Sequence, residues 1–480
     1  MSNSTHFLDL FFYPRNVAVV GASRSQRSNN YYLAENMVRL GFPGKVFPVN
    51  PNATEILGLK AYPNIGSIED EVDLAVISVP ARMTLGIVRE CVAKKVKGIT
   101  IVAGGFSEIG TDGRKTQDEI LSLLRANGIR AIGPNALSPV NSANSLIVGF
   151  GPTTRKLPRG GLSFIFQSGL YQPRLNWLTF DLNLRISKLI DLGNKMDINE
   201  VDALEYLAQD EDTRVIALHM ESIAGDARRF MQVLRETTPH KPVIVLKSGR
   251  TAAGAKAASS HTAAIMKSSD TVVDVALRQA GAIRVHGLDE FFDLAKAFEY
   301  LPPLKGNRVA IATFSGGEGV LTTDAAELNG LAVAEPGAVT RQKLVKIFPP
   351  WEIPLNPFDT GVTGQLHSGV DVAREFIMAV ADDPAVDCAA IQIGGGPWVM
   401  GQTDKEQKDG TPKRNDNAAT PYLNLVARGK TVVTWTVDPG SKGGQIQQLE
   451  ENGVPVYPSA ERAVRALGAV WRYGGIKNPS

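Results

Sequence analysis

The stretch Val17-Ala-Val-Val-Gly-Ala-Ser23 decides the fold class of this chain. It reads as a short apolar strand that is buried on both faces, which is typical of parallel sheets covered by helices. The strand ends at Gly21, and the residues that follow lead into a helical stretch. In open α/β sheets ligands bind beyond the carboxyl ends of the strands, so the turn at Gly21 is a candidate ligand contact.

Strands of the same kind recur along the chain and alternate with longer helical stretches, which predicts an α/β fold built on parallel sheets. The predicted strands are 17–23, 45–50, 73–80, 98–103 and 129–133, then 162–166, 186–190, 215–220 and 242–246, and finally 308–313, 388–393 and 431–435. A Gly/Pro/Arg-rich linker at 151–161 and the Pro-rich segment 302–306 separate these groups. We therefore expect three doubly wound domains, at 1–150, 151–301 and 302–480.

The bulk composition narrows the class of protein. A length of 480 residues suits about three domains, and 43% hydrophobic with 21% charged residues is typical of a soluble globular protein. A net charge of +2 provides no bulk attraction to nucleic acid or to an anionic membrane. There is no run of about 18 apolar residues and no export signal, so we expect a cytoplasmic protein. The polar segment 403–417 is expected to be a mobile excursion.

The cysteines and histidines give no sign of a metal site or a disulfide. Cys91 and Cys388 lie far apart inside apolar segments, so we expect small core residues in a reducing compartment. The six histidines are scattered, without the close spacing that metal ligands need.

The loop Gly21-Ala-Ser-Arg-Ser-Gln-Arg-Ser28 lies where backbone amides at a helix start hold phosphate groups. It lacks the Gly-x-Gly-x-x-Gly pattern and an acidic residue for a ribose, which disfavours a nicotinamide cofactor. Arg24, Arg27 and three serines suit a more heavily phosphorylated ligand. A purely structural turn explains the same residues equally well.

A second candidate anion site follows the strand 162–166, at Phe166-Gln-Ser-Gly-Leu170. We expect a helix to begin there with Pro173 in its first turn, so that free amides and the Ser168 hydroxyl bind an anion. Glu221 closes the strand 215–220 at the same edge, where a carboxylate can orient an imidazole. A solvated edge glutamate is the alternative.

His261 lies in the unusual stretch 249–265, which is composed mostly of small residues. Small neighbours allow a close approach of ligands. The cations Arg250 and Lys256, with nearby hydroxyls, suit an arriving phosphate. A nucleophilic histidine that carries a phosphoryl group needs such surroundings. The alternative is a surface or capping histidine on an Ala-rich helix.

Further motifs occur in a fixed order along nearly the whole chain. In the first domain these are Val19–Ser23, Val49–Pro51, Asp73–Ala81, Ala103–Glu108 and Gly133–Asn135. In the second they are Gln167–Gly169, Asp191–Lys195, Glu205–Leu207, Glu221, Lys247–Arg250 and Ser260–Thr262 with Asp270; in the third, Ser315–Gly319 and Asn356–Asp359. Together they resemble the α subunit of the NDP-forming acyl-CoA synthetases, the superfamily that includes succinyl-CoA synthetase.

The resemblance implies a Rossmann-like CoA-binding domain followed by two flavodoxin-like domains. It also implies a ligase that makes acyl-CoA from a carboxylic acid, CoA and ATP through acyl-phosphate and phosphohistidine intermediates. His261 would accept the phosphoryl group, Gln167, Ser168 and Gly169 would cradle it, and Glu221 would support the ring. The implied CoA contacts are Gly21, Ala22, Ser23, Ser25, Asn50, Val79, Pro80, Gly104, Gly105, Glu108 and Asn135.

The nucleotide-binding ATP-grasp unit of this reaction has no counterpart in the chain. The resemblance therefore implies a separate ATP-grasp β chain that holds ATP or ADP and Mg, in a hetero-oligomer. Two other functions are open: a CoA-dependent transferase or lyase on the same scaffold, and a non-catalytic CoA- or acyl-CoA-sensing module. Tyr171 and Ala263 replace the small residues usual in the family, which favours the sensor. The joint presence of His261, Glu221 and Gln167–Gly169 favours the ligase.

Overall fold

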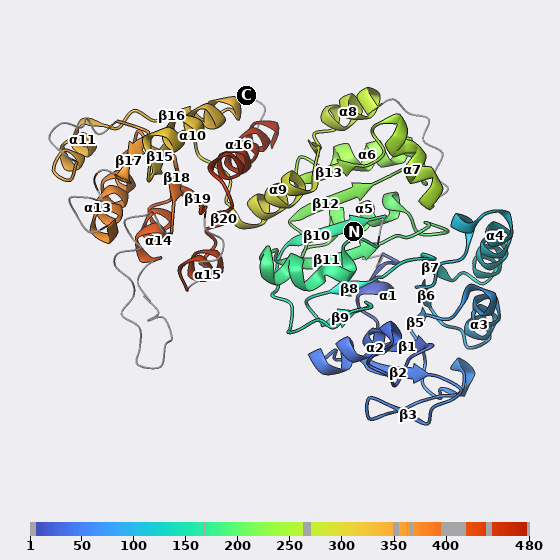
Figure 1. Ribbon diagram of the computed structural model, residues 1–480. Helices are drawn as coiled ribbons and strands as arrows, with labels where there is room; N and C mark the ends of the chain where they lie inside the picture. Colours follow the sequence, from blue (N-terminus) through green and yellow to red (C-terminus); the bar gives the residue numbers. More distant parts are fainter. Residues whose placement is uncertain are drawn as a thin grey trace, which may run out of the picture. The chain divides into compact units, whose positions relative to one another are not determined.

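The computed structural model describes residues 6–167, 169–262, 270–348, 355–361, 363, 369–394, 419–437 and 444–477. The chain forms two compact units, residues 1–291 and 292–480 (Figure 1). Both units consist of mainly parallel sheets with helices, which confirms the α/β class. The polar segment 403–417 lies outside the described residues.

The first sheet has the strand order β2-β1-β5-β6-β7, and all of its strands are parallel. Its strands are β1 (Asn16–Val20), β2 (Lys45–Val49), β5 (Leu74–Ile77), β6 (Gly98–Ile101) and β7 (Arg130–Ile132), accompanied by α1 (Asp9–Phe12), α2 (Asn29–Leu40), α3 (Ala81–Ala93) and α4 (Thr111–Ala126). Since β2 and β5 lie on opposite sides of β1, the winding reverses there. In open α/β sheets, ligands bind beyond the carboxyl ends of the strands at such a reversal. A separate hairpin of β3 (Glu55–Ile56) and β4 (Leu59–Lys60) was not predicted.

The second sheet has the order β14-β13-β12-β10-β11-β8-β9 and its winding reverses at β10. Its strands are β8 (Val140–Asn141), β9 (Leu146–Ile147), β10 (Leu162–Phe166), β11 (Ile186–Asp191), β12 (Val215–Met220), β13 (Val243–Lys247) and β14 (Ile283–Val285), with helices α5 (Glu200–Gln209), α6 (Ala227–Thr237), α7 (Ala252–Thr262) and α8 (Asp270–Gln279). The short β8–β9 hairpin is antiparallel and pairs with β11, although it precedes residue 150. The domain division at residues 150 and 301 stays a prediction.

The segment after β10 differs from the prediction. The helical part begins only at Gln172, as a 3₁₀ turn η3 (Gln172–Arg174) followed by a π-helical turn η4 (Trp177–Asp181). Pro173 lies in the first turn of η3, as expected. The predicted helix start at Gln167–Gly169 is wrong because Tyr171 turns into the core, where its ring stacks on Phe166 with centroids 3.6 Å apart. Ser168 is outside the described residues.

One hydrophobic cluster joins the two sheets of the first unit. It contains Val19 of β1 together with Ile165 of β10 and Leu218 of β12. Burial of apolar surface across this junction stabilises the pair of sheets as one unit.

The second unit contains a third parallel sheet, ordered β16-β15-β18-β19-β20 with β17 paired to β15. Its strands are β15 (Arg308–Thr313), β16 (Ala332–Val333), β17 (Phe358–Asp359), β18 (Cys388–Gln392), β19 (Thr431–Trp435) and β20 (Val456–Tyr457). Its helices are α10 (Gly316–Leu328), α11 (Ala338–Leu344), α13 (Gly369–Ala381), α14 (Thr420–Ala427), α15 (Gly444–Glu451) and α16 (Ala460–Lys477), while α9 (Leu288–Tyr300) crosses the boundary between the units.

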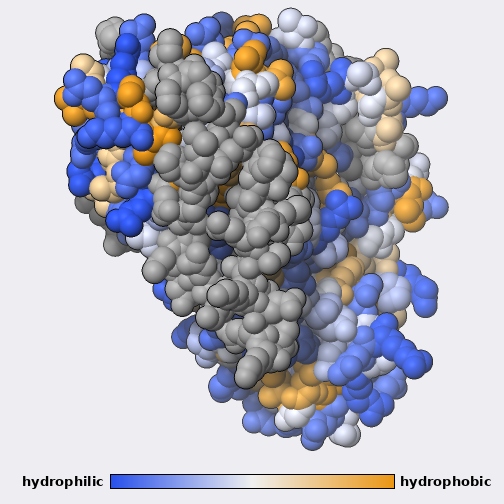
Figure 2. Space-filling model, turned by 60° about the vertical axis from the view of Figure 1, so that its left-hand side comes forward, coloured by the Kyte–Doolittle hydropathy of each residue, from blue (hydrophilic) through white to orange (hydrophobic). Residues whose placement is uncertain are grey.

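The prediction that Cys91 and Cys388 are core residues is confirmed, since both are fully buried. Within the described ranges, no helix combines the length and the apolarity needed to cross a bilayer. On the face drawn in Figure 2, hydrophilic residues predominate and hydrophobic ones form small separate groups.

Gly193→Ala is expected to destabilise the chain. Gly193 has a φ of +54°, and an added Cβ would lie 2.2 Å from the carbonyl oxygen of Pro134. Strain and the clash together should lower the free energy of unfolding by at least about 2 kcal/mol, measured by urea titration. Gly86→Ala is the control, because Gly86 is exposed within α3 with open space around it; it should stabilise by up to about 1 kcal/mol. A Gly193→Ala variant as stable as wild type would contradict the close packing.

Candidate active site

The loop after β1 is clamped against the loop after β5. Gly21 has a φ of +90°, and a Cβ there would lie only 2.4 Å from the carbonyl oxygen of Ser78. The side-chain amide of Asn30 donates to the carbonyl oxygens of Gly21 and Ser78, at 3.0 and 2.9 Å. Asn30 Oδ1 accepts from the Ser78 hydroxyl at 2.8 Å. The two loops that flank the winding reversal are therefore held in one arrangement.

Several predicted CoA contacts lie on the loops at this winding reversal. The side-chain amide of Asn50 donates to the carbonyl oxygen of Ala22 at 2.8 Å, and the Ser25 N–H donates to Ser23 Oγ at 3.1 Å. Val79 lies beside Gly21, since its Cγ1 is 3.1 Å from the position of an added Cβ there. Pro80 immediately precedes α3. Arg24 and Arg27 are exposed on the same loop, so cations and backbone amides are both present for a phosphate-bearing ligand.

Glu108 links the first sheet to the second. It lies in η2 (Ser107–Ile109), and its carboxylate accepts hydrogen bonds from the Gly105 N–H at 2.6 Å and the Phe106 N–H at 3.1 Å. It also accepts from the side-chain amide of Asn194, in the loop after β11, at 2.6 Å. Burial acts to raise the pKa of Glu108, but the hydrogen bonds from Gly105 and Asn194 outweigh it, and the pKa lies below its usual value.

The backbone completes this junction. The Asn194 N–H donates to the carbonyl oxygen of Pro134 at 2.8 Å. The buried carboxylate of Asp191 accepts from the Leu137 N–H at 3.0 Å. Asn135 has a φ of +60°, and its side chain lies beside Gly104, where an added Cβ would be 3.4 Å from Asn135 Oδ1. The loops after β6, β7 and β11 thus form one packed cluster.

Gln167 holds the turn that carries Glu221. Its Oε1 accepts from the N–H groups of Glu221 and Ser222, at 2.9 and 3.1 Å, and its Nε2 donates to the Ser222 hydroxyl at 3.3 Å. Lys195 Nζ donates to the carbonyl oxygen of Ser222 at 2.7 Å and forms an ion pair with Glu200 at 3.1 Å. The side chain of Gln167 therefore positions the neighbouring strand end. Within the described part of the chain, no atom lies within 4 Å of a Cβ added at Gly169.

Two lysines act electrostatically on Glu221. Burial lowers the pKa of Lys195, and the nearby carboxylates of Glu200 and Glu221 act in the opposite direction. Burial also lowers the pKa of Lys247, to about 8, and Glu221 again opposes the shift. Since Lys247 is paired with Met220 in the sheet, Glu221 and the end of β13 lie at the same edge.

The segment of His261 starts at this edge. The chain leaves β13 through Ser248–Thr251 and enters α7, where Thr251 Oγ1 accepts from the Gly254 N–H at 3.0 Å. Helix α7 lies beside η2, the turn that carries Glu108. His261 belongs to the last turn of α7, but its side chain lies outside the described residues. Arg250, a predicted phosphate ligand, forms an ion pair with Asp270 at 3.4 Å.

The structure thus brings most of the predicted residues to the adjoining edges of two sheets. The sequence did not reveal Asn30, Asn194 or Lys195 as the residues that fix the loops. Their partners Ser78, Glu108 and Ser222 are 48, 86 and 27 residues away in the chain. The arrangement places hydrogen-bond donors and cations, which suit phosphate groups, on both sides of the junction. The Glu221 carboxylate lies close to the amines of Lys195 and Lys247.

Comparison with protein families identifies the two parts of the first unit. Residues 15–140 match the CoA binding domain, and residues 159–298 match the succinyl-CoA ligase like flavodoxin domain. The chain is 36% identical to subunit alpha of acetate–CoA ligase [ADP-forming] I of Pyrococcus furiosus, and the alignment covers 98% of each chain.

It is also 36% identical to acetate–CoA ligase [ADP-forming] II of Archaeoglobus fulgidus, covering 96% of this chain and 66% of that protein, so the chain spans about two thirds of its length. Among solved structures, acetyl-coenzyme A synthetase 1 of Ca. Korarchaeum cryptofilum, in complex with phosphate and ADP, is 30% identical. It superimposes with a TM-score of 0.84, over 98% of this chain and 97% of that chain.

Glu108→Gln should destabilise the chain at neutral pH, by about 1–3 kcal/mol, because the charge that accepts three hydrogen bonds is lost. The folded pKa of Glu108 lies below its ordinary value of 4.5, so its contribution is fully present above that pH and is lost as the pH falls through the folded pKa. Urea titrations between pH 7 and pH 3 should show a difference from wild type that is constant above pH 4.5 and shrinks as the pH falls below it.

The exposed Glu119, paired with Arg89, provides the control; Glu119→Gln should change stability by less than about 0.5 kcal/mol. A difference for Glu108→Gln that stays constant with pH would rule out the proposed role of its charge.

Proposed function

Because this chain belongs to the NDP-forming acyl-CoA synthetases, we propose that it is the α subunit of such an enzyme and makes acyl-CoA from a carboxylic acid, CoA and ATP. The observation that carries the proposal is the position of α7, the helix of His261, beside the η2 turn of the CoA binding domain. In this proposal the site of thioester formation and the helix of the phosphorylated histidine lie at the same junction between the first and second sheets.

We assign CoA to the carboxyl ends of β1 and β5 and to the adjoining loops. The residues are those expected from the sequence, namely Gly21, Ala22, Ser23, Ser25, Asn50, Val79, Pro80, Gly104, Gly105, Glu108 and Asn135. The clamped loops at Gly21 and Ser78 support this assignment, since they lie at the winding reversal, where ligands of open α/β sheets bind. Glu108 contributes by fixing the Gly105 loop.

In the direction of synthesis, phosphorylated His261 is attacked at phosphorus by the carboxylate of the acid. The phosphorus–nitrogen bond breaks, the imidazole is released, and an acyl phosphate forms. The CoA thiolate then attacks the acyl carbon, and inorganic phosphate leaves with the electron pair of the carbon–oxygen bond. Gln167, Ser168 and Gly169 are proposed to bind the phosphoryl group during these steps.

Glu221 is proposed to accept a hydrogen bond from the His261 ring and so fix its orientation. Its backbone is fixed by Gln167, which favours a defined position for its carboxylate. Lys195 and Lys247 add positive potential that favours the oxygens of a phosphoryl group.

A partner completes the reaction. Relatives that match over nearly their whole length are named as α subunits, which implies a separate partner chain. We propose that the partner is an ATP-grasp β subunit that binds ATP or ADP with Mg, in a hetero-oligomer. The small residues of the first turns of α7 favour a movement of His261 toward it, because few side chains must be unpacked.

Tyr171 does not favour a sensing module once its position is known. Its side chain is only 1% exposed and packs on Phe166, so it does not fill the anion site expected at Gln167–Gly169. Ala263, the other unusual position, lies outside the described residues.

His261→Asn is expected to abolish both phosphorylation and ligation. With the β chain, ATP and Mg, wild type should gain an acid-labile, base-stable phosphate on His261, detected by mass spectrometry, whereas the variant should gain none and should bind CoA normally. The exposed His240 provides the control, and His240→Asn should behave as wild type. Full thioester formation by His261→Asn would end the proposed mechanism.

Glu221→Gln should lower the yield of phosphorylated enzyme at least about tenfold, because the neutral amide stabilises the cationic imidazole poorly. The affinity for CoA, measured by calorimetry, should stay within a factor of about two since CoA is assigned to the other sheet. Glu236→Gln, at an exposed site on α6, serves as the matched control. An unchanged phosphoenzyme yield would remove Glu221 from the mechanism.

A further inference from the structure

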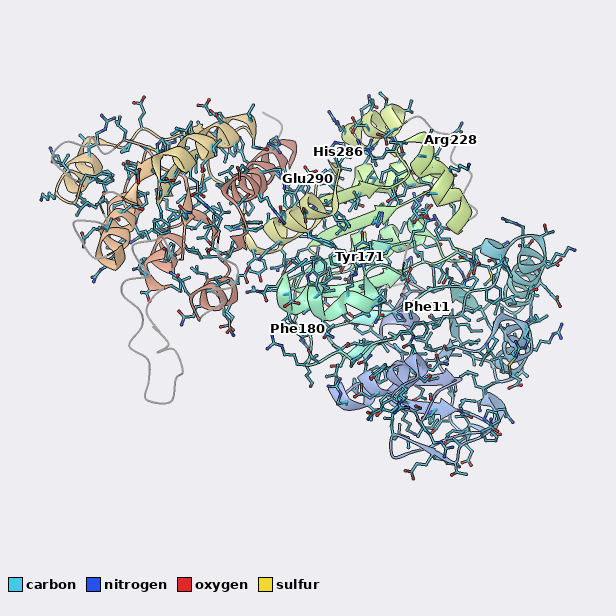
Figure 3. The ribbon with its side chains drawn as sticks, viewed as in Figure 1. Phe11, Tyr171, Phe180, Arg228, His286 and Glu290 are labelled. Atoms are coloured by element: carbon cyan, nitrogen blue, oxygen red, sulfur yellow. The ribbon has the colours of Figure 1, made fainter. Side chains whose placement is uncertain are left out.

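The buried side chains of Tyr171 and His219 and the half-buried side chain of Ser248 form a hydrogen-bonded chain across the second sheet. The Tyr171 hydroxyl lies 2.6 Å from His219 Nδ1, and His219 Nε2 is hydrogen-bonded to the Ser248 hydroxyl. The Tyr171 ring stacks on Phe166 and meets the His219 ring edge-on, with centroids 5.5 Å apart. Figure 3 labels Tyr171, which lies between β10 and η3. No step described so far uses His219 or Ser248.

The protonation states of this chain follow from burial. Burial, assisted by the charge of Lys247, lowers the pKa of His219 to about 4, so the imidazole is neutral at physiological pH. Burial raises the pKa of Tyr171, so the phenol keeps its proton. A neutral imidazole has one donor nitrogen and one acceptor nitrogen.

The order of the hydrogen bonds determines what Ser248 offers. A phenol is a better donor than acceptor, so Tyr171 donates to Nδ1 of His219. The proton of His219 is then on Nε2, which donates to Ser248 Oγ. The Ser248 hydroxyl accepts this bond and keeps its own proton to donate elsewhere.

This arrangement does not make Ser248 a nucleophile. In a catalytic triad a carboxylate stabilises the imidazolium that forms when the serine loses its proton. Here a phenol takes the place of the carboxylate, and a histidine with a pKa of about 4 is a weak base. The chain orients the serine and leaves it protonated.

Ser248 lies at the edge where the phosphoryl chemistry is proposed. It directly follows β13, and its N–H donates to the carbonyl oxygen of Met220 at 3.0 Å, which places it next to Glu221. It also begins the connection to α7. The Lys247 ammonium bonds to the carbonyl oxygen of Ser248, so a hydroxyl donor and a cationic group share this turn.

We propose that Ser248 donates a hydrogen bond to the phosphate or acyl phosphate bound at this edge, and that His219 and Tyr171 are positioning residues for its hydroxyl. The inference rests on the proposed function. The unprotonated oxygens of phosphate accept hydrogen bonds, so they favour a hydroxyl that presents its proton. The hydrogen bond from His219 favours this orientation of the hydroxyl, because it occupies a lone pair of Ser248.

The test uses the full chain, the acyl-CoA that wild type prefers from a panel, and radiolabelled inorganic phosphate. Phosphorylation of the enzyme then reports acyl-phosphate formation and transfer to His261. Ser248→Ala should raise the KM for phosphate about tenfold or more, while the KM for acyl-CoA stays near that of wild type. Ser248→Thr should restore most of the affinity for phosphate.

Two variants of His219 distinguish a role in positioning the Ser248 hydroxyl from a role in folding. The amide of His219→Asn replaces Nδ1 and cannot reach Ser248, so its KM for phosphate should rise as in Ser248→Ala. The amide of His219→Gln replaces Nε2, so it should recover at least half of that loss. Tyr171→Phe keeps the ring stack and should show a smaller rise. Ser122→Ala, at an exposed site on α4, is the control with no expected change.

If wild type becomes labelled on His261 but Ser248→Ala has the same KM for phosphate as wild type, the inference is overturned and the proposed function is left intact. Equal values for His219→Asn and His219→Gln would overturn the positioning role. A rise in the KM for acyl-CoA equal to that for phosphate would indicate a general structural defect and would also overturn it. Wild type without label on His261 would overturn the proposed function itself.

Discussion

The hydrogen bonds of the Glu108 carboxylate are the interaction on which the arrangement of the first unit depends, because they join its two sheets. It accepts hydrogen bonds from Gly105 in its own loop and from Asn194 in the loop of the neighbouring sheet. Beside it, Gly193 packs so closely on Pro134 that no side chain fits. Contacts that involve the backbone tolerate little displacement. The carboxyl edges of the two sheets are therefore fixed against each other, and α7 starts from one edge and lies beside η2 on the other.

Several polar side chains that are expected to contact phosphate also bind neighbouring residues of the protein. Gln167 binds the N–H groups of Glu221 and Ser222, and Arg250 pairs with Asp270. Hydrogen bonds of this kind reduce the freedom of strand-end turns, which lowers the cost of ordering them around a ligand. The same principle extends inward to Tyr171 and His219, whose bonds determine how the hydroxyl of Ser248 is presented.

The sequence predicted the long strands well because they are continuous apolar runs, as at 162–166 and 308–313. It missed two-residue strands such as β8 and β9, which are too short to show a period. It placed the helix after β10 too early, since the pattern did not reveal that Tyr171 turns into the core. The hydrogen bond between Asn194 and Glu108 could not be predicted, because the two residues are 86 positions apart in the chain.

The central claim is that the CoA-binding loops and the segment leading to His261 belong to one coupled junction. Hydrogen exchange of the chain with and without CoA, followed by mass spectrometry, tests it most directly. The account predicts that CoA slows exchange at residues 21–25 and 79–81 and also across the junction, at 193–195 and at 248–252. Protection confined to the first sheet, with unchanged exchange beyond the Glu108–Asn194 contact, would contradict it.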